Sequence, residues 1–533
     1  MRVMNRRSWR DLASAEPKCQ KITADVCIVG AGAAGIYLAG ELCRRGRRVV
    51  VLEAGPRKGI NSAEIGFDPS FEAMPYHGAT LGRYFGLGGS TIRWGGVLVP
   101  HSEYDLRSEA TGNDVWFHIV QTVRAQTSAV LSRLGYEYHP DITAAPEYLS
   151  DDVVAALTGA GLHVQANLQM PFFKKNFVHL LGELPGKYPQ PVVVYNAVAK
   201  NWSAERGLSD TGISSVTAVS RTGNELAVVA GQFVIAAGAI ESARILLELQ
   251  ELGIGKNLKP GLVRSHYLAD HLSCRIADVD VKDLDRTAAL FAPRFSGAWM
   301  RGVRLLERDA SKETPRAFAH FIFSNASAGF DLARQVLLAV QARRMPAISI
   351  ATAVTGASDL ARLAYSRLVR AQLHVPSGTP VHLQLDMEQG VARGNCIRLS
   401  DARDAFGRRK TSIHWRVAEN DLADMRKIAR RIIEKWPGAQ SGLPRLLPRE
   451  IDSEKMKPHD AYHPVATCRM GDDPEVIVDR DMRVSGVRNL WVSSTGVLPS
   501  AGTANPTFTM LCLTHRLAAH LAATGNGITV RNV

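Results

Sequence analysis

The chain has 533 residues, of which 46% are hydrophobic and 22% are charged. These fractions are typical of a globular protein and exclude a disordered, collagen-like or disulfide-stapled chain. Lysine and arginine (64) outnumber aspartate and glutamate (51), which gives a formal net charge of +13. A basic surface attracts acidic partners, but no zinc-finger, RNA-binding or basic-zipper pattern accompanies this one. We therefore predict a basic surface without a nucleic-acid partner.

Cysteine usage and hydropathy indicate where the protein works. The seven cysteines form no Cys-x-x-Cys pair and no metal-binding spacing. No apolar run reaches the ~18 residues that a membrane span requires. The basic N-terminal residues lack the apolar core of a secretory signal. These features predict a cytoplasmic protein with reduced thiols, no transmembrane segment and no metal site.

The strongest local pattern lies at residues 25–55. A buried strand (26–29) leads into Gly30, Gly32 and Gly35, spaced as G-x-G-x-x-G. In such a unit the first glycine allows a tight turn, the second lets the backbone approach a pyrophosphate, and the third lets helix and strand pack. The helix N-terminus then faces the phosphates. A helix over 33–45 and a strand over 47–52 complete the unit, and Glu53 at its end can accept hydrogen bonds from both ribose hydroxyls.

This unit predicts dinucleotide binding. The motif does not distinguish FAD from NAD, but its place near the start of a long chain favours FAD. Residues 80–96 contain six glycines, too many for a helix interior or a regular strand, and predict a loop against a flat ligand. Residues 232–250 combine a buried strand, the Ala237-Gly238 turn and an amphipathic helix, which suits a further contact with the same cofactor.

The remaining elements are less distinct. Strands are predicted over 192–194 and at Val198, and a hairpin over 215–228. Alternating polar and apolar residues then predict an antiparallel sheet with strands over 381–387, 396–399 and 411–415, the last two joined by a turn at 404–407. Helices are predicted over 330–342, 359–371 and 421–435, of which the first two are basic and interpreted as a solvated face rather than a membrane anchor.

Short motifs carry the chemistry near the C-terminus. Between residues 459 and 522 they follow one another as His463-Pro464, Thr467-Cys468-Arg469-Met470-Gly471, Val478-Asp479, Asn489-Leu490 and Asn505-Pro506-Thr507. In this order they resemble the C-terminal region of the glucose–methanol–choline (GMC) oxidoreductase family. The βαβ unit, the loop at 82–96 and the turn at 236–238 are similar to the same family, whereas residues 280–380 carry almost none of the likeness.

The resemblance implies an α/β fold with two domains. A Rossmann-like FAD domain would be assembled from the discontinuous segments 22–270 and 455–533. A substrate domain over 271–454 would hold an antiparallel sheet flanked by helices. The expected cofactor contacts are Gly30, Gly32, Ala33, Gly35, Glu53, Ala54, Gly89, Ser90, Arg93, Trp94, Val198, Ala237, Gly238, Gly496, Asn505, Pro506 and Thr507.

The resemblance also implies that an alcohol is oxidised by hydride transfer to flavin N5. Asn505-Pro506, where many members have histidine, resembles the sugar-oxidising branch of pyranose oxidases and gluconate dehydrogenases. We therefore expect a sugar, glycoside or polyol as substrate and oxygen or another electron acceptor. Arg93 stands where covalently linked members have histidine, so FAD is expected to be non-covalent. Ser494 stands where many members have aspartate.

His463 and Asn505 are the predicted catalytic pair. A histidine titrates near neutral pH and can take the hydroxyl proton as the hydride leaves. Asn505 can donate a hydrogen bond to the same oxygen and suits an N-cap, with Pro506 as the first helical residue. The N-terminus of the helix over 507–521 would then favour negative charge on reduced flavin. His459 is the nearby alternative, and we interpret His515, His520 and Cys468 as structural.

Two other functions stay open. The chain could be a lyase that keeps FAD as a structural group, or the flavin subunit of an electron-transfer complex with the basic helices as docking surface. An oligomer or a separate acceptor subunit also stays open. Reduction of the flavin by added sugar distinguishes the oxidoreductase from the lyase.

Overall fold

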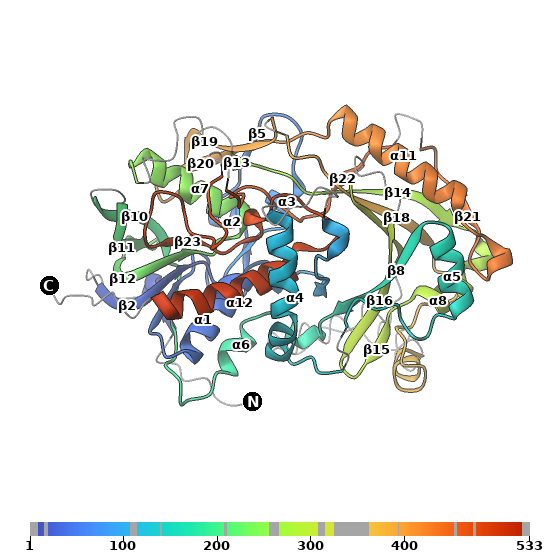
Figure 1. Ribbon diagram of the computed structural model, residues 1–533. Coiled ribbons are helices and arrows are strands. Elements are labelled where there is room, and N and C mark those ends of the chain that lie inside the picture. The colour runs from blue at the N-terminus through green and yellow to red at the C-terminus, as the bar shows by residue number, and fades with distance from the viewer. Residues whose placement is uncertain are drawn as a thin grey trace, which may run out of the picture.

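The computed structural model describes residues 9–14, 20–106, 115–138, 141–206, 211–254, 266–307, 315–324, 362–392, 394–451, 456–472 and 476–524. Figure 1 shows two lobes. The first contains a mostly parallel sheet beside α1 (Ala33–Arg44) and α12 (Pro506–Thr524). The second contains an antiparallel sheet, with α5 (Asp151–Gly159), α8 (Leu284–Phe291) and α11 (Glu419–Lys435) on its outer side.

The first sheet has eight strands among the described residues, in the order β1-β9-β3-β2-β12-β11-β10, with β23 also paired to β12. Strands β3, β2, β12 and β23 pair in parallel, while β10, β11 and β12 are antiparallel neighbours. The predicted hairpin over 215–228 is the β11–β12 pair. The strands are β1 (Trp9–Asp11), β2 (Gln20–Val29), β3 (Val49–Leu52), β9 (Val192–Tyr195), β10 (Val198–Arg206), β11 (Thr211–Val219), β12 (Glu225–Ile235) and β23 (Leu490–Val492).

The predicted βαβ unit is present as β2, α1 and β3. Every residue of α1 from Ala34 to Cys43 is buried. A helix that is buried all round needs partners on several faces, and α12 and α6 (His179–Gly182) both pack on α1. On its other side α12 packs on α4 (Val115–Leu134). The last helix is therefore fixed between α1 and α4, and its N-terminus points toward the second lobe (Figure 1).

The second sheet has nine strands among the described residues, in the order β21-β14-β18-β17-β16-β8-β7, with β15 on β16 and β22 on β14. Each of these pairs is antiparallel. β7 and β8 come from the part of the chain assigned to the FAD domain, so the sheet crosses the predicted boundary. The strands are β7 (Val97–Leu98), β8 (Leu162–Gln169), β14 (His271–Val279), β15 (Arg294–Ser296), β16 (Trp299–Glu307), β17 (Ala317–Phe323), β18 (Val381–Glu388), β21 (Leu446–Pro448) and β22 (His459–Asp460).

A smaller sheet joins the two lobes, in the order β13-β19-β20-β5. The predicted strands over 396–399 and 411–415 are the antiparallel pair β19–β20. The prediction of one sheet that also contains the strand over 381–387 is wrong, because that strand is β18 of the nine-stranded sheet. The turn between β19 and β20 is held by the Asp404 carboxylate, which accepts hydrogen bonds from the backbone N–H groups of Phe406 (2.8 Å) and Arg408 (3.0 Å). These strands, with the short pair β4–β6, are β4 (Ile60–Asn61), β5 (Ser70–Phe71), β6 (Tyr84–Phe85), β13 (His266–Tyr267), β19 (Cys396–Arg403) and β20 (Arg409–His414).

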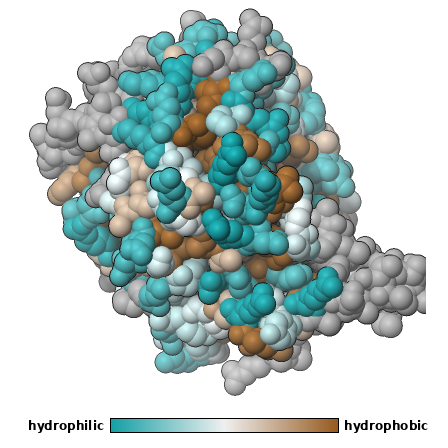
Figure 2. Space-filling view, turned by 90° about the vertical axis from the view of Figure 1, so that its right-hand side faces the viewer, coloured by the Kyte–Doolittle hydropathy of each residue, from teal (hydrophilic) through white to brown (hydrophobic). Residues whose placement is uncertain are grey.

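The helices complete both lobes. The predicted helix over 421–435 is α11, and the helix predicted over 359–371 is helical over 362–369. The helix predicted over 330–342 lies outside the described residues. None of the described helices combines the length and the apolar character of a membrane span. Figure 2 shows the outer face of the second lobe, where hydrophilic side chains cover most of the surface and apolar ones emerge in separate places. The other helices are α2 (Ser62–Ile65), α3 (His77–Thr80) and α7 (Gly238–Glu251).

Candidate active site

A cavity of about 570 Å³ extends from the N-terminus of α1 to the N-terminus of α12. This volume is in the range of small-molecule and cofactor sites. Two predicted contacts, Gly35 and Gly496, do not line the cavity. The predicted contacts that do line it are Gly30, Gly32, Ala33, Glu53, Ala54, Gly89, Ser90, Arg93, Trp94, Val198, Ala237, Gly238, Asn505, Pro506 and Thr507, and the predicted catalytic residue His463 lines it as well.

The three glycines of the first motif have different structural roles. Gly30 has φ +109°, and a Cβ there would lie 2.5 Å from the carbonyl oxygen of Ala236. A Cβ at Gly35 would lie 1.9 Å from the carbonyl oxygen of Gly30, so Gly35 lets α1 pack on the turn. A Cβ at Gly32 would meet nothing within 4 Å, and this residue lines the cavity. The motif therefore holds the α1 N-terminus open to a ligand.

Glu53 connects three loops at one end of the cavity. Its carboxylate accepts hydrogen bonds from the backbone N–H groups of Ala31 (2.8 Å), Gly55 (2.9 Å) and Gly86 (2.8 Å). Burial raises the pKa of Glu53 to about 7, although these donors favour the charged form. Glu53 thus organises the cavity wall, and its predicted contact with ribose hydroxyls stays a prediction.

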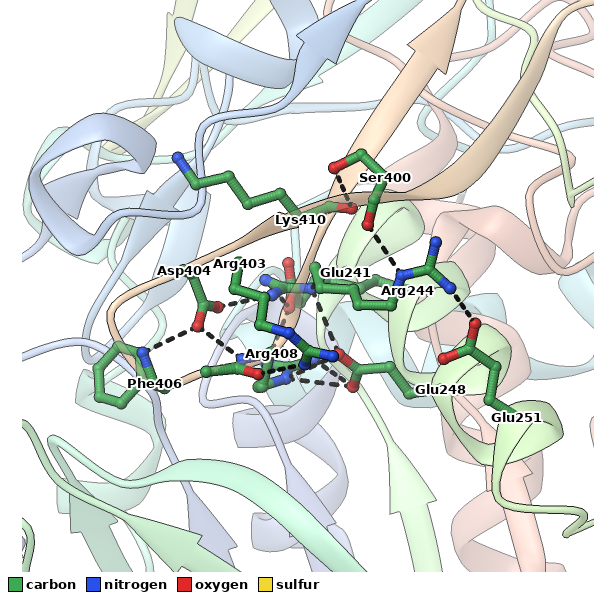
Figure 3. A network of polar contacts seen from close by, with 12 residues as sticks. Glu241, Arg244, Glu248, Glu251, Ser400, Arg403, Asp404, Phe406, Arg408 and Lys410 are labelled. Atoms are coloured by element: carbon green, nitrogen blue, oxygen red, sulfur yellow. Dashed lines mark hydrogen bonds and ion pairs between the residues drawn. The ribbon is translucent and has the colours of Figure 1, made fainter.

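A buried network of charges forms another part of the wall (Figure 3). Glu241, on α7, is at its centre. One carboxylate oxygen accepts from Arg83 (3.0 Å), and the other is 3.2 Å from both Arg244 and Arg408. Although burial opposes ionisation, the three arginines lower the pKa of Glu241. The complete network contains three arginines and three carboxylates: Arg83, Arg244, Arg408, Glu241, Glu248 and Asp404.

Three members of this network, Arg83, Glu241 and Arg408, line the cavity, and the sequence analysis missed them. Nη1 of Arg83 is buried and has no hydrogen-bond partner among the described residues. A buried guanidinium that faces a cavity suits an anionic ligand group. The sequence did contain a pattern that could have indicated them: charged residues at positions i, i+3 and i+7 of α7 (Glu241, Arg244 and Glu248), on a mostly apolar helix that directly follows a glycine turn.

His463 and Asn505 meet at the other end of the cavity. Nδ2 of Asn505 lies 3.1 Å from Nε2 of His463, and both residues line the cavity. Asn505 directly precedes α12, which begins at Pro506 as predicted. Asp270 accepts two hydrogen bonds from the backbone N–H of His463, at 2.9 and 3.0 Å. The main chain of His463 is therefore held by a buried carboxylate.

Asp270 and His271 support this pair, and sequence reasoning missed both. Nδ1 of His271 lies 3.1 Å from Nδ1 of His463, and its Nε2 lies 2.9 Å from the carbonyl oxygen of Gly502. Asp270 also accepts hydrogen bonds from the Tyr76 hydroxyl and the His271 backbone N–H. A metal ion could in principle bind the side-chain oxygen and nitrogen atoms of Asp270, His271 and His463. These atoms instead make the hydrogen bonds to protein groups described above, and we assign the three residues as a hydrogen-bonded cluster. An adjacent Asp-His pair was the available signal.

The environment changes the expected titration of His463. Burial, with a smaller contribution from the neighbouring His271, lowers the pKa of His463 to about 3, whereas the sequence predicted titration near neutrality. Burial also lowers the pKa of His271. Both rings are therefore neutral at physiological pH, and each carries one proton and one lone pair.

The other residues singled out from the sequence lie as follows. His459 is exposed on β22 and does not line the cavity. His515 lies within α12, where its Nδ1 is 2.9 Å from the Tyr37 hydroxyl. Cys468 is one of six described cysteines that are buried as free thiols. Arg93 lines the cavity, and its guanidinium lies over the Tyr84 ring at 5.0 Å. Ser494 also lines the cavity.

The cavity fits FAD on three observations. The cavity extends from the glycine turn at the α1 N-terminus, where phosphates bind well, to the polar pair of His463 and Asn505. Arg83 presents a buried N–H group without a protein partner, and Gly32 leaves open space where a side chain would project. An elongated dinucleotide with an anionic centre and a flat redox ring matches these features.

Comparison with known proteins agrees with this geometry. Residues 391–514 match the family model described as GMC oxidoreductase, and residues 28–81 match that of an NAD(P)-binding Rossmann-like domain. The chain is thus similar to GMC oxidoreductases over its C-terminal part and to Rossmann-like domains near its N-terminus. It is an oxidoreductase that uses FAD.

The chain is similar to proteins with named activities over shares of its length that differ from one protein to the next. Pyridoxine 4-oxidase from Microbacterium luteolum is 24% identical over 545 residues, which is 90% of this chain and 96% of that protein. C-glycoside 3-oxidase from Arthrobacter globiformis is 31% identical over 140 residues, 26% of this chain and 25% of that protein. The crystal structure of pyridoxine 4-oxidase from Mesorbium loti covers 94% of this chain and 99% of that one, with a TM-score of 0.57 and 17% identity. This last likeness establishes the shared fold.

Proposed function

We propose that this oxidoreductase oxidises a CH–OH group of a sugar, glycoside or polyol to a carbonyl, with His463 as the base. The observation that carries the proposal is the pair of His463 Nε2 and Asn505 Nδ2, 3.1 Å apart and both on the cavity. Bound FAD supplies the hydride acceptor. The chain itself must then bind the alcohol, take its proton and stabilise the charge that develops.

His463 and Asn505 divide the work at the substrate hydroxyl. The neutral His463 ring accepts the hydroxyl proton at Nε2, because burial lowers its pKa to about 3 and so keeps this nitrogen unprotonated. Asn505 Nδ2 donates a hydrogen bond to the same oxygen and orients it. A general base in this position contributes roughly 10²- to 10⁴-fold to the rate.

The N-terminus of α12 stabilises negative charge at this end of the cavity. Pro506 and Thr507 form its first turn, and both line the cavity. The unpaired backbone N–H groups of a helix N-terminus carry partial positive charge. A ligand that becomes more anionic during the reaction is therefore favoured here.

Two observations support the substrate class and the mode of FAD binding. Asparagine is the partner of His463, as in the sugar-oxidising branch that the C-terminal motifs resemble, and the chain is 31% identical to a C-glycoside 3-oxidase over 140 residues. Arg93 lacks a nucleophilic nitrogen for a stable link to flavin, so we propose non-covalent FAD. The electron acceptor is oxygen or another oxidant.

Pyridoxine is the second candidate substrate. It is favoured by the likeness to pyridoxine 4-oxidase, which extends over 90% of this chain. Its reacting group is also a CH–OH, so the same base serves both candidates.

Anaerobic mixing of the FAD-loaded enzyme with single compounds tests the proposal. We expect sugars, glycosides or polyols to bleach the visible absorption of the flavin and pyridoxine to leave it unchanged. Bleaching by pyridoxine alone would assign the second candidate. A flavin that none of these compounds reduces, in an enzyme that cleaves a cyanohydrin, would contradict oxidoreductase function and identify a lyase.

A further inference from the structure

We propose that His271 is a positioning residue that fixes which nitrogen of His463 carries the proton. The inference rests on the proposed function, because it concerns the base of that reaction. The observation behind it is the continuous row of polar atoms from the Asn505 amide through both imidazole rings to the carbonyl oxygen of Gly502.

The direction of this row follows from its last member. The carbonyl oxygen of Gly502 can only accept a hydrogen bond, so Nε2 of His271, 2.9 Å away, carries a proton. In a neutral imidazole the other nitrogen then has a lone pair. Nδ1 of His271 therefore accepts, and Nδ1 of His463, 3.1 Å away, carries the proton and donates.

The same rule determines the catalytic nitrogen. Because Nδ1 of His463 is protonated, its Nε2 has the lone pair, and this is the atom that faces Asn505 Nδ2 at 3.1 Å. An amide N–H only donates, so this contact agrees with the direction set from Gly502. His463 is thereby held ready to accept a proton at Nε2, the nitrogen that the proposed reaction requires.

Further hydrogen bonds hold the Gly502 end of the row and the main chain of both histidines. The backbone N–H of Gly502 donates to Glu388 on β18 (3.2 Å), and that of Thr503 donates to Asp105 (2.6 Å). Asp270 holds the backbone N–H groups of both His271 and His463. The backbone at Gly502 and at the two histidines is thus held by buried carboxylates.

The surroundings favour neutral rings in this arrangement. His271 is fully buried, and the Phe318 ring packs edge-on against it, with 5.6 Å between centroids. A charged imidazolium would lose its hydration there. Among the described residues, four ionisable groups lie around the two rings: Asp270, Asp386, Glu388 and His101. Asp270 precedes His271 in the chain, Asp386 and Glu388 are on β18, and His101 is on the loop before Asp105. Tyr76 and Asp460 lie behind Asp270.

Loss of the hydrogen-bond acceptor at position 271 should allow His463 to adopt the tautomer that carries its proton on Nε2. Without it, Nδ1 of His463 has no partner to hold its proton, and the proton can occupy Nε2. A base with its proton on the reacting nitrogen cannot accept another. In a serine protease, the comparable loss of tautomer control with intact geometry lowers turnover by about 10⁴-fold.

Two substitutions of similar size separate tautomer control from packing. In His271→Asn, the side-chain oxygen can accept from Nδ1 of His463. In His271→Leu, the side chain has nearly the same shape but no acceptor. His101→Asn is the matched control, because His101 is equally buried and lies 2.9 Å from the carbonyl oxygen of Ala501, one residue from Gly502, but makes no hydrogen bond to His463.

The rate constant of anaerobic flavin reduction is the first readout. We expect His271→Leu to be roughly 10²- to 10⁴-fold slower than wild type, with FAD still bound. We expect His271→Asn to stay within about tenfold, and the apparent substrate affinity of all three variants to change by less than about threefold. Equal rates in His271→Asn and His271→Leu would overturn the inference.

Nitrogen NMR of protein labelled with ¹⁵N-histidine gives a second readout that does not depend on activity. Spectra of wild type, compared with those of His463→Gln to assign the ring, should show protonated Nδ1 and unprotonated Nε2 in His463. His101→Asn should keep this signature and His271→Leu should lose it. Protonated Nε2 in the wild type would overturn the inference even if His271→Leu failed to fold. If His463→Ala reduced its flavin at the wild-type rate, the proposed base would be wrong, whichever tautomer the spectra showed.

Discussion

Glu241→Gln removes one charge from the buried network beside the cofactor cavity. The substitution preserves shape, but it leaves three arginines with two carboxylates. The Glu241 carboxylate has contacts of 3.0 to 3.2 Å with Arg83, Arg244 and Arg408, and its side chain is 6% exposed. The variant therefore leaves an uncompensated positive charge in the interior.

The expected cost follows from this burial. Removal of one partner from a buried ion pair lowers the free energy of unfolding by roughly 3–5 kcal/mol. The matched control is Glu251→Gln on the same helix, where the side chain is 44% exposed and pairs with Arg409. An exposed pair contributes about 0–1 kcal/mol. We also expect a smaller cost in the FAD-loaded protein, because Arg83 and Arg408 line the cavity that receives an anionic ligand.

Urea unfolding of both variants, with and without FAD, measures these differences. The pH dependence provides a further check. The arginines lower the pKa of Glu241 from its ordinary value of 4.5 in the folded state, so its contribution is complete above pH 4.5 and is lost as pH falls through the folded pKa. The gap between wild type and Glu241→Gln should narrow over that range. Equal midpoints for Glu241→Gln and Glu251→Gln at neutral pH would refute the reasoning.

Three other predictions follow from the cavity. Gly32→Val should fold but purify without colour, because its side chain projects into the cavity. Gly35→Ala should fail to fold, because its Cβ would lie 1.9 Å from the carbonyl oxygen of Gly30. Circular dichroism and visible absorption together distinguish the two variants. Acid precipitation should release yellow FAD into the supernatant, and a yellow pellet would contradict non-covalent binding. Flavin reduction should not depend on the protonation of His463 from about pH 5 to 8, because this base is unprotonated above its pKa of about 3; an acidic limb near pH 6.5 that disappears in His463→Ala would contradict the lowered pKa.

Local sequence was sufficient where structure depends on neighbours in the chain. The glycine spacing and the apolar periodicity of residues 25–55 predicted β2, α1 and β3, because backbone sterics and one buried face determine this unit. The local sequence could not predict that β2 begins at Gln20, because the first half of β2 forms by pairing with β12, some 200 residues away in the chain. For the same reason β8 was missed, since it is held by β16.

The candidate site shows the same division. His463 and Asn505 were found because they belong to ordered motifs, and the structure brings them to 3.1 Å. His271 is 192 residues from His463 in the chain and has no local signal beyond the preceding aspartate. The lowered pKa of His463 was also unavailable, because it depends on burial by both lobes. Composition and spacing identify chemical groups, and only packing determines their protonation.

The role of His463 as the base is the central claim, and rapid anaerobic mixing of His463→Ala with the best reducing substrate tests it most directly. His459→Ala is the matched control, since His459 is exposed and lies outside the cavity. We predict that His463→Ala retains FAD and reduces it roughly 10²- to 10⁴-fold more slowly than wild type, while His459→Ala stays close to wild type. Flavin reduction at the wild-type rate in His463→Ala, or its loss in His459→Ala alone, would contradict the assignment.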